Sequence, residues 1–248
     1  MSVRDDDICF KRSRYIVYQP YMGLHLAYHV KRSCFSGQSE YQKIDIIENE
    51  AYGRMLLLDN NVQHTTYDAR IFNEALCGAA KRNELAQLIV LGGGSGQTVI
   101  SLLESPEVSQ VTVVEIDEMV VEACRRHVKG VKRAFDDPRV RIVIADAFGY
   151  IRKMREHFDA AIIDFTELPF SPRNNLAMLK QLYADVKEKC GGHCSQYIGS
   201  SVGLAYGPKF RRLVDSASKR VLTGIKYEDT FIPSFGAPHT FMHAGYSR

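Results

Sequence analysis

The pattern of apolar positions changes near residue 66. Before that point, short runs of β-branched, aromatic and aliphatic residues occur at 14–18, 23–30, 41–47 and 54–58, separated by Gly and Asn. Runs of this length between turn-forming residues are typical of β-strands. The pattern therefore predicts a small N-terminal β-strand domain over residues 1–66.

The second part of the chain alternates between helical and strand patterns. Apolar residues recur at helical spacing over 67–82. Near-continuous apolar runs follow at 88–91, 111–114, 140–144 and 160–163. Such runs are typical of strands that are buried on both faces of a parallel sheet. Helical spacing between these runs predicts βαβ units with right-handed crossovers.

Three further strands are predicted at 194–197, 226–232 and 240–244, again separated by helical patterns. The predicted fold class is therefore α/β, with a doubly wound, mostly parallel seven-stranded sheet. This sheet would form a Rossmann-like catalytic domain over residues 67–248. In such sheets, ligands bind at the carboxyl ends of the strands, where the strand order reverses.

A glycine-rich turn follows the first of the parallel strands. Gly92, Gly94 and Gly96 allow the backbone to approach a ligand closely, and the N–H groups of the next helix face it. A dinucleotide fingerprint needs Gly or Ala three positions after Gly94, where Gln97 stands. The turn therefore favours S-adenosylmethionine or a close relative over NAD.

Acidic residues close the next two strands. Glu115 ends the second strand, where an acid accepts hydrogen bonds from ribose hydroxyls in nucleoside-binding α/β folds. Asp146 ends the third strand, and the small Ala147 beside it leaves room for an adenine ring. Asp117 is expected to cap the next helix. Each acid taken alone fits a helix cap equally well, but their common place at strand ends favours a nucleoside site.

Two more acids, Asp164 and Glu167, follow the fourth strand. A carboxylate pair at the mouth of this crevice could bind a cation or remove a proton. The alternative interpretation is that Asp164 caps a turn and that Glu167 is solvated.

Over about residues 39–196, the sequence resembles the spermidine and spermine synthase family of aminopropyltransferases. The motifs that carry the resemblance are SEYQ at 39–42, YGRMLLLD at 52–59, Val62-Gln63 with Thr66 and Asp68, GGGSG at 92–96, VEID at 114–117, Asp146, Asp164 with Glu167, and Gln196. The stretch 164–169 is closer to spermine synthases than to spermidine synthases.

The resemblance implies an enzyme of polyamine biosynthesis that transfers an aminopropyl group from decarboxylated S-adenosylmethionine to an amine and releases methylthioadenosine. Asp164 would bind the attacking amine and act as its base, because an alkylamine with a pKa of about 10.4 must lose a proton before it attacks. The sulfonium carries its own leaving group, so no metal is expected.

The resemblance also assigns the remaining site residues by position. The cofactor-binding positions are Gln42, Gln63, Gly92, Gly94, Ser95, Gly96, Glu115, Ile116, Asp146 and Ala147. The polyamine side would be lined by Asp68, Phe72, Glu167 and Gln196.

Several positions depart from the family pattern. Ser95 stands where the family usually has an acid that holds the terminal ammonium of the aminopropyl group, and a hydroxyl supplies no charge. Phe72 replaces a common tyrosine, and Ala69 and Ala237 lie where acids occur in relatives. Two alternatives therefore remain open: an S-adenosylmethionine-dependent methyltransferase on the same scaffold, and a non-catalytic homologue.

Composition limits the partners. The chain has 248 residues, 45% hydrophobic and 25% charged, with a net charge of +3 and cations spread along its length. Nucleic acid and membrane surfaces are not indicated. No apolar run approaches the roughly 20 residues of a bilayer span, so a cytoplasmic protein is expected. Cys190, His193 and Cys194 lack the distant partners of a tetrahedral metal site.

Aromatic residues near the N-terminus suggest an assembly surface. Tyr15, Ile16, Tyr18, Tyr21 and Tyr28 could supply an apolar interface, which is the kind of surface in which aromatic side chains are enriched. The family resemblance implies a homodimer through this region. The same residues could instead form the core of the small domain.

Overall fold

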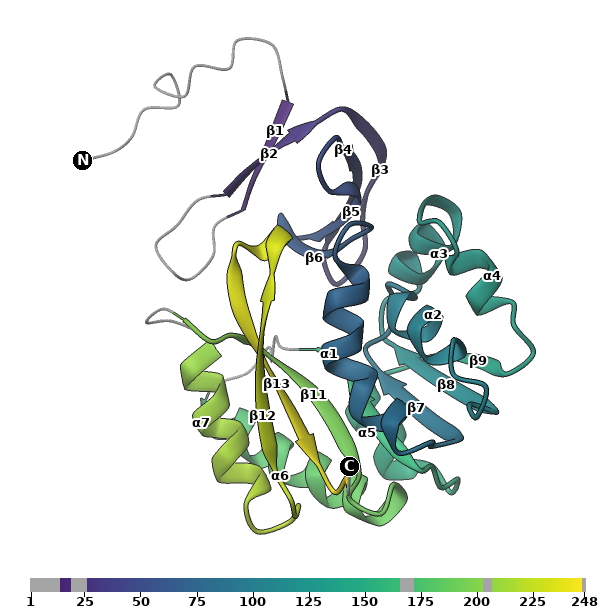
Figure 1. The fold of residues 1–248 in the computed structure, drawn as a ribbon, viewed down its shortest axis with the longest axis vertical. Coiled ribbons are helices and arrows are strands. Elements are labelled where there is room, and N and C mark those ends of the chain that lie inside the picture. Colours follow the sequence, from purple (N-terminus) through teal and green to yellow (C-terminus); the bar gives the residue numbers. More distant parts are fainter. Residues whose placement is uncertain (1–13, 19–25, 166–171, 203–206, 247–248) are drawn as a thin grey trace.

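A seven-stranded sheet forms the centre of the protein (Figure 1). The structure is a computed structural model that describes residues 14–18, 26–165, 172–202 and 207–246. The strand order is β12-β13-β11-β10-β7-β8-β9. The bounds are β7 (Gln87–Leu91), β8 (Gln110–Glu115), β9 (Val140–Ile144), β10 (Ala160–Ile163), β11 (Cys194–Ser200), β12 (Lys226–Ile232) and β13 (Ala237–Ala244).

Five neighbouring strands, from β11 to β9 in the sheet order, run parallel, whereas β13 is antiparallel to both β11 and β12. The predicted α/β class with a mostly parallel seven-stranded sheet is confirmed. Chain order and sheet order diverge at β7, because β8 and β9 lie to one side of it and β10 and β11 to the other. A ligand crevice is expected at the carboxyl end of β7 for this reason.

Helices cover both faces of the sheet. They are α1 (Ala69–Arg82), α2 (Gln97–Leu103), α3 (Glu118–His127), α4 (Val131–Phe135), α5 (Ala147–Lys153), α6 (Pro172–Lys189) and α7 (Gly207–Ser218). Alternate residues of β7 pack on opposite sides: Leu88 and Val90 join the core with α1 to α4, and Ile89 and Leu91 join the core with α5 to α7. The continuous apolar run in this strand therefore results from burial on both faces. In the part of the chain that the structure describes, no helix has the length and apolar character of a membrane span.

The N-terminal part forms two antiparallel sheets. β1 (Arg14–Tyr18) pairs with β2 (Leu26–Val30). A four-stranded sheet has the order β3-β4-β5-β6, with bounds β3 (Arg32–Gln38), β4 (Lys43–Asn49), β5 (Gly53–Leu58) and β6 (Asn61–Thr65).

Two of these strands were not predicted from the sequence. β3 is largely polar and mostly exposed, so it gives no apolar run. β6 follows β5 after a two-residue turn at Asp59 and Asn60, whose φ values of 47° and 63° are the positive values that a tight hairpin needs. Because only two residues separate β6 from β5, the sequence does not distinguish β6 from the loop that follows β5.

Hydrogen bonds connect the four-stranded N-terminal sheet to α3 and to the end of β8. Arg54 of β5 donates a 2.7 Å hydrogen bond from Nη1 to the carbonyl oxygen of His127 in the last turn of α3. Ser39 and Gln42, between β3 and β4, reach Asp117 at the end of β8. The carboxyl end of the parallel sheet is therefore covered by the N-terminal sheet.

Candidate active site

The glycine turn after β7 brings two candidate acids together. Gly92 has a φ of 88°, and a Cβ there would lie 2.9 Å from the carbonyl oxygen of Asp164. A Cβ at Gly94 would lie 2.8 Å from Oε2 of Glu115. Side chains at these two positions would collide with the ends of β10 and β8, so glycine is required for the close approach.

Glu115 is held by the backbone around it. Its Oε2 accepts a 3.0 Å hydrogen bond from the N–H of Gly94, and its Oε1 accepts from the N–H groups of Ile116 and Asp117 at 2.8 and 3.0 Å. Burial raises the pKa of Glu115, and these backbone hydrogen bonds oppose the rise. The carboxylate is thus fixed at the end of β8, beside the glycine turn.

Asp117 joins the N-terminal sheet to this end of β8. Its Oδ1 accepts from the N–H of Met119, which confirms the predicted helix cap on α3. Its Oδ2 accepts from Ser39 Oγ at 2.6 Å and from Gln42 Nε2 at 3.0 Å. The structure therefore places Gln42 close to Glu115, although the two are far apart in the sequence.

Asp146 caps a helix in this structure. Its side chain accepts hydrogen bonds from the N–H groups of Phe148 and Gly149 at the start of α5, at 3.3 and 2.9 Å. The carboxylate is exposed, and Ala147 beside it is half-buried. The cap alternative thus describes Asp146 here, and its contact with adenine stays a prediction.

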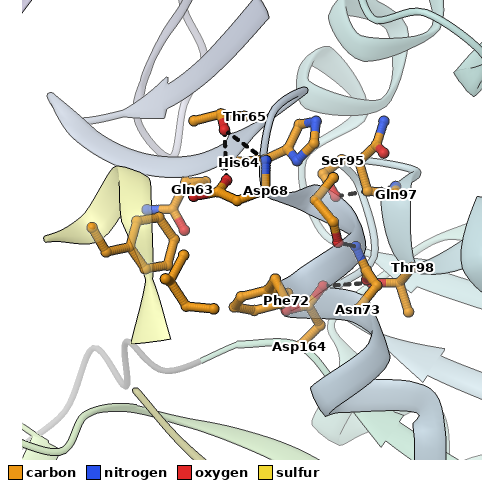
Figure 2. Close-up of a pocket in the computed structure, with 13 residues that line it drawn as sticks. Gln63, His64, Thr65, Asp68, Phe72, Asn73, Ser95, Gln97, Thr98 and Asp164 are labelled. Atoms are coloured by element: carbon orange, nitrogen blue, oxygen red, sulfur yellow. Dashed lines mark hydrogen bonds between the residues drawn. The ribbon is translucent and has the colours of Figure 1, made fainter. Parts of the chain in front are cut away.

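A pocket opens beside the glycine turn, between β6, the start of α1, the end of β10 and the 3₁₀ turn Pro233–Phe235 (Figure 2). Its lining consists of Gln63, His64, Thr65, Asp68, Ala69, Phe72, Asn73, Ser95, Gln97, Thr98, Asp164, Ile232 and Phe235. Five of the predicted site residues are brought together here: Gln63, Asp68, Phe72, Ser95 and Asp164.

The charge of this lining is negative. Asp68 and Asp164 are its acids, and no Lys or Arg occurs among the described lining residues. Burial lowers the pKa of His64 to about 3, so its imidazole is neutral at pH 7. The pocket is therefore suited to a positively charged amine and unsuited to an anion.

Asp68 is tied to two neighbouring segments. It is only 2% exposed, its Oδ1 accepts from Thr65 Oγ1 of β6 at 2.5 Å, and its Oδ2 accepts from the N–H of Ser234 at 2.7 Å. It occupies the N-cap position of α1, where its carbonyl oxygen accepts from the N–H of Phe72 but its side chain makes no cap hydrogen bond. Asp68 thus holds the wall of the pocket together and adds a negative charge to it.

Asp164 lies half-buried at the end of β10. Its Oδ2 accepts a 2.9 Å hydrogen bond from Thr98 Oγ1 of α2. Burial raises the pKa of Asp164 to about 7, the hydrogen bond from Thr98 lowers it, and the charge of Glu115 raises it further. A carboxyl group with a pKa near neutrality can both accept and release a proton at physiological pH.

Two of the predicted amine-side residues have different surroundings. Phe72 lines the pocket and packs against Tyr197 and Phe241, with ring centroids 4.9 and 5.2 Å away. Gln196 is fully buried on β11, where its Oε1 accepts a 2.6 Å hydrogen bond from the Tyr183 hydroxyl of α6.

The structure does not bring Gln196 to the pocket. Side chains alternate between the faces of a strand, and Gln196 shares its face with Cys194 and Ile198, which pack in the core with α6 and α7. Glu167 lies outside the described residues.

Sequence reasoning missed two residues beside Asp164, namely Thr98 and Asn73. Thr98 is the second residue of α2 and Asn73 lies inside α1, so each resembles an ordinary polar residue of a helix. Only the fold shows that the Thr98 hydroxyl lies within hydrogen-bonding distance of both Asn73 and Asp164.

Comparisons with known proteins identify related sequences. A family model described as the spermine/spermidine synthase domain matches residues 66–198, and one described as the spermidine synthase tetramerisation domain matches residues 15–66. A polyamine aminopropyltransferase of Thermoplasma volcanium is 31% identical over 217 residues, which cover 86% of this chain and 77% of the relative. Polyamine aminopropyltransferase 2 of Caldanaerobacter subterraneus is 38% identical over 173 residues, 67% of this chain and 58% of the relative.

Solved structures show the same fold. A spermidine synthase from Thermotoga maritima superposes with a TM-score of 0.81 at 24% identity, covering 98% of this chain and 84% of that one. A spermidine synthase in complex with the transition state analogue AdoDATO superposes with a TM-score of 0.79 at 25% identity and the same coverage.

Proposed function

Since the chain belongs to the spermine/spermidine synthase family, we propose that it transfers an aminopropyl group from decarboxylated S-adenosylmethionine to an amine and releases methylthioadenosine. The observation that carries this proposal is the pocket around Asp164. Its described lining holds two carboxylates and no cationic side chain, and Asp164 has a pKa near neutrality.

Asp164 acts as the base for the attacking amine. An ammonium group entering the pocket is attracted by Asp164 and Asp68, and Asp164 accepts its proton. The free nitrogen then attacks the carbon next to the sulfonium. A C–N bond forms, the C–S bond breaks, and its electron pair goes to sulfur, which leaves as a neutral thioether.

The nucleoside lies across the glycine turn. Glu115 accepts hydrogen bonds from the ribose hydroxyls, because its carboxylate is fixed at the end of β8 beside Gly94. The further nucleoside contacts of the proposal are Gln42, Gln63, Gly92, Ser95, Gly96, Ile116, Asp146 and Ala147. Gln42 supports this placement, since its amide reaches Asp117 next to Glu115.

Methyl transfer from intact S-adenosylmethionine is a second candidate function. Ser95 favours it, because a half-buried hydroxyl in the pocket does not repel the carboxylate of the intact nucleoside. The charges of Asp68 and Asp164 oppose it, because they repel the same carboxylate. Aminopropyl transfer is therefore the better-supported function.

Ligand binding and product analysis test the proposal together. The purified protein is titrated calorimetrically with methylthioadenosine, with decarboxylated S-adenosylmethionine and with the intact form. It is then incubated with each sulfonium and a set of mono- and diamines, and the products are identified by mass spectrometry. Preference for the decarboxylated form with an aminopropylated product supports the proposal, whereas a methylated product would replace it with methyl transfer. Tight binding of any of these ligands without a product from any amine would point to a non-catalytic homologue.

The organisation of the chain supports a homo-oligomer of two-domain subunits. The proposed domains are residues 1–66 and 67–248, and the two family models meet at residue 66. The tetramerisation description of the first match supports assembly through the N-terminal sheets, as a homodimer or a larger oligomer. Sedimentation at micromolar concentration tests this, since a single 28.0 kDa species would contradict assembly.

A further inference from the structure

The hydroxyl of Thr98 lies between two oxygen acceptors beside the pocket. Thr98 Oγ1 is 2.9 Å from Asp164 Oδ2 and 3.0 Å from Asn73 Oδ1 (Figure 2). Thr98 and Asn73 are only 1% and 3% exposed, so bulk water does not compete for these bonds. Because a hydroxyl carries one proton, Thr98 can donate to only one of the two oxygens at a time.

The amide of Asn73 is oriented by its own helix. Its Nδ2 donates a 2.8 Å hydrogen bond to the carbonyl oxygen of Ala69, one turn earlier in α1. Rotating the amide by half a turn would set two carbonyl oxygens against each other with no proton between them. The side-chain oxygen of Asn73 therefore faces Thr98 as a fixed acceptor.

The number of hydrogen bonds depends on the proton of Asp164. When Asp164 is ionised, Thr98 donates to the carboxylate, because hydrogen bonds to a charged acceptor are the stronger ones. When Asp164 is protonated, its carboxyl group donates to Thr98, and the Thr98 hydroxyl turns to Asn73. The protonated state thus makes two hydrogen bonds in this chain of three residues, and the ionised state makes one.

We propose that Thr98, supported by Asn73, is a positioning residue for Asp164 that reverses its hydrogen bond when Asp164 accepts a proton. Thr98 holds Oδ2 of Asp164 in both states. No described residue donates to Oδ1, which is left for the substrate amine. A proton taken up on Oδ1 reaches Thr98 when the carboxyl group makes a half-turn that exchanges its two oxygens. The additional bond to Asn73 favours the state in which Asp164 has taken the proton. We call this reversal of the Thr98 hydrogen bond the switch. Its role in catalysis rests on the proposed function, whereas the switch itself is a property of the ligand-free protein.

Other ionisable groups near Asp164 are unchanged by a substitution at Asn73. Glu115 raises the pKa of Asp164 by its charge. Asp68 and His64 line the same pocket, and His64 is neutral. Cys77 of α1 is buried, and its raised pKa keeps it a thiol.

The test measures the protonation of Asp164 directly. Asn73→Leu removes the second acceptor, so the protonated state loses one hydrogen bond and the ionised state loses none. The pKa of Asp164 is expected to fall by about 0.4 to 1 unit. The readout is the carboxyl stretch of Asp164 in infrared difference spectra of the ligand-free protein, titrated across the neutral range. The band is assigned by its loss in Asp164→Asn.

Two substitutions at Thr98 provide the matched controls. Thr98→Ser keeps the hydroxyl and is expected to retain the wild-type pKa. In a Thr98→Val background, Asn73→Leu is expected to have no further effect, because Asn73 acts only through the hydroxyl. Asn73→Ala removes the same oxygen and serves if circular dichroism shows that Asn73→Leu does not fold.

A pKa that stays constant or rises when the Asn73 oxygen is removed would overturn the inference. So would an equal fall in the Thr98→Val background, since that would show a general effect of α1. The two proposals can also fail separately. If Asn73→Leu lowers the pKa of Asp164 but the wild type transfers no aminopropyl group, the hydrogen-bond reversal is supported and the proposed function is refuted.

Discussion

The most direct test of the proposed nucleoside site is the substitution Gly94→Ala. The added methyl group would lie 2.8 Å from Glu115 Oε2, and an ordinary contact begins at 3.4 Å, so the carboxylate must move by about 0.6 Å. Three backbone N–H groups hold Glu115 in place, and the shift opposes all three bonds. Losing one hydrogen bond between a ribose hydroxyl and this charged acceptor costs about 1.5 to 3 kcal/mol, which corresponds to a loss of about 10- to 150-fold in affinity.

Calorimetric titration with methylthioadenosine measures this loss in the wild type and in the variant. Gly78→Ala is the matched control, because it makes the same chemical change in α1 at a position where only the flexible end of Arg82 lies within 3 Å of the new methyl group. The control is expected to keep the wild-type affinity. An affinity within two-fold of the wild type in Gly94→Ala would show that Glu115 does not bind the ribose from its place beside the turn.

Four further predictions concern Asp164 and Tyr28 of β2. Asp164→Asn should reduce aminopropyl transfer by about 100-fold or more and leave the affinity for methylthioadenosine unchanged, and steady-state kinetics near the wild-type values would remove Asp164 from the mechanism. In the wild type, kcat/KM should fall as the pH drops through about 7, because protonated Asp164 cannot accept the amine proton, and a profile without an acid limb near 7 would contradict this. Since the pKa of Asp164 is raised from 3.8 to about 7 on folding, the folded state binds the proton more tightly and loses stability as the pH rises between these values. Asp164→Asn should therefore resist urea better than the wild type at pH 8 and lose this advantage toward pH 4. Tyr28→Phe removes the hydrogen bond from the Tyr28 hydroxyl to the carbonyl oxygen of Ser234 and should lower the free energy of unfolding by about 1 kcal/mol, whereas an unchanged urea midpoint would show that this bond is replaced by water.

The parallel strands could be predicted from the sequence because burial on both faces leaves a continuous apolar run. Burial on both faces also removes the polar–apolar alternation from which the direction of individual side chains could be predicted. In β11 nearly every residue is buried, so the alternation that would show which way Gln196 points is absent from the sequence. Its direction follows from the packing of its face of β11 against α6 and α7.

The candidate site shows a similar division between local and long-range information. The closeness of the glycine turn to Glu115 could be predicted, because the turn and the acid follow adjacent parallel strands. Thr98 and Asn73 could not, because their role depends on contacts across 66 and 25 positions of the chain. A polar residue inside a helix carries no mark of such a contact in the sequence.

The bonds from Ser39 and Gln42 to Asp117 have a consequence for assembly. They connect the segment between β3 and β4 to the proposed nucleoside site, so an interaction that stabilises the four-stranded sheet also stabilises this part of the proposed site. Binding free energies are reciprocal. If subunits associate through the N-terminal sheets and association tightens nucleoside binding by some factor, the nucleoside must strengthen the association by the same factor. The apparent dissociation constant of the oligomer then depends on the fraction of sites that the nucleoside occupies.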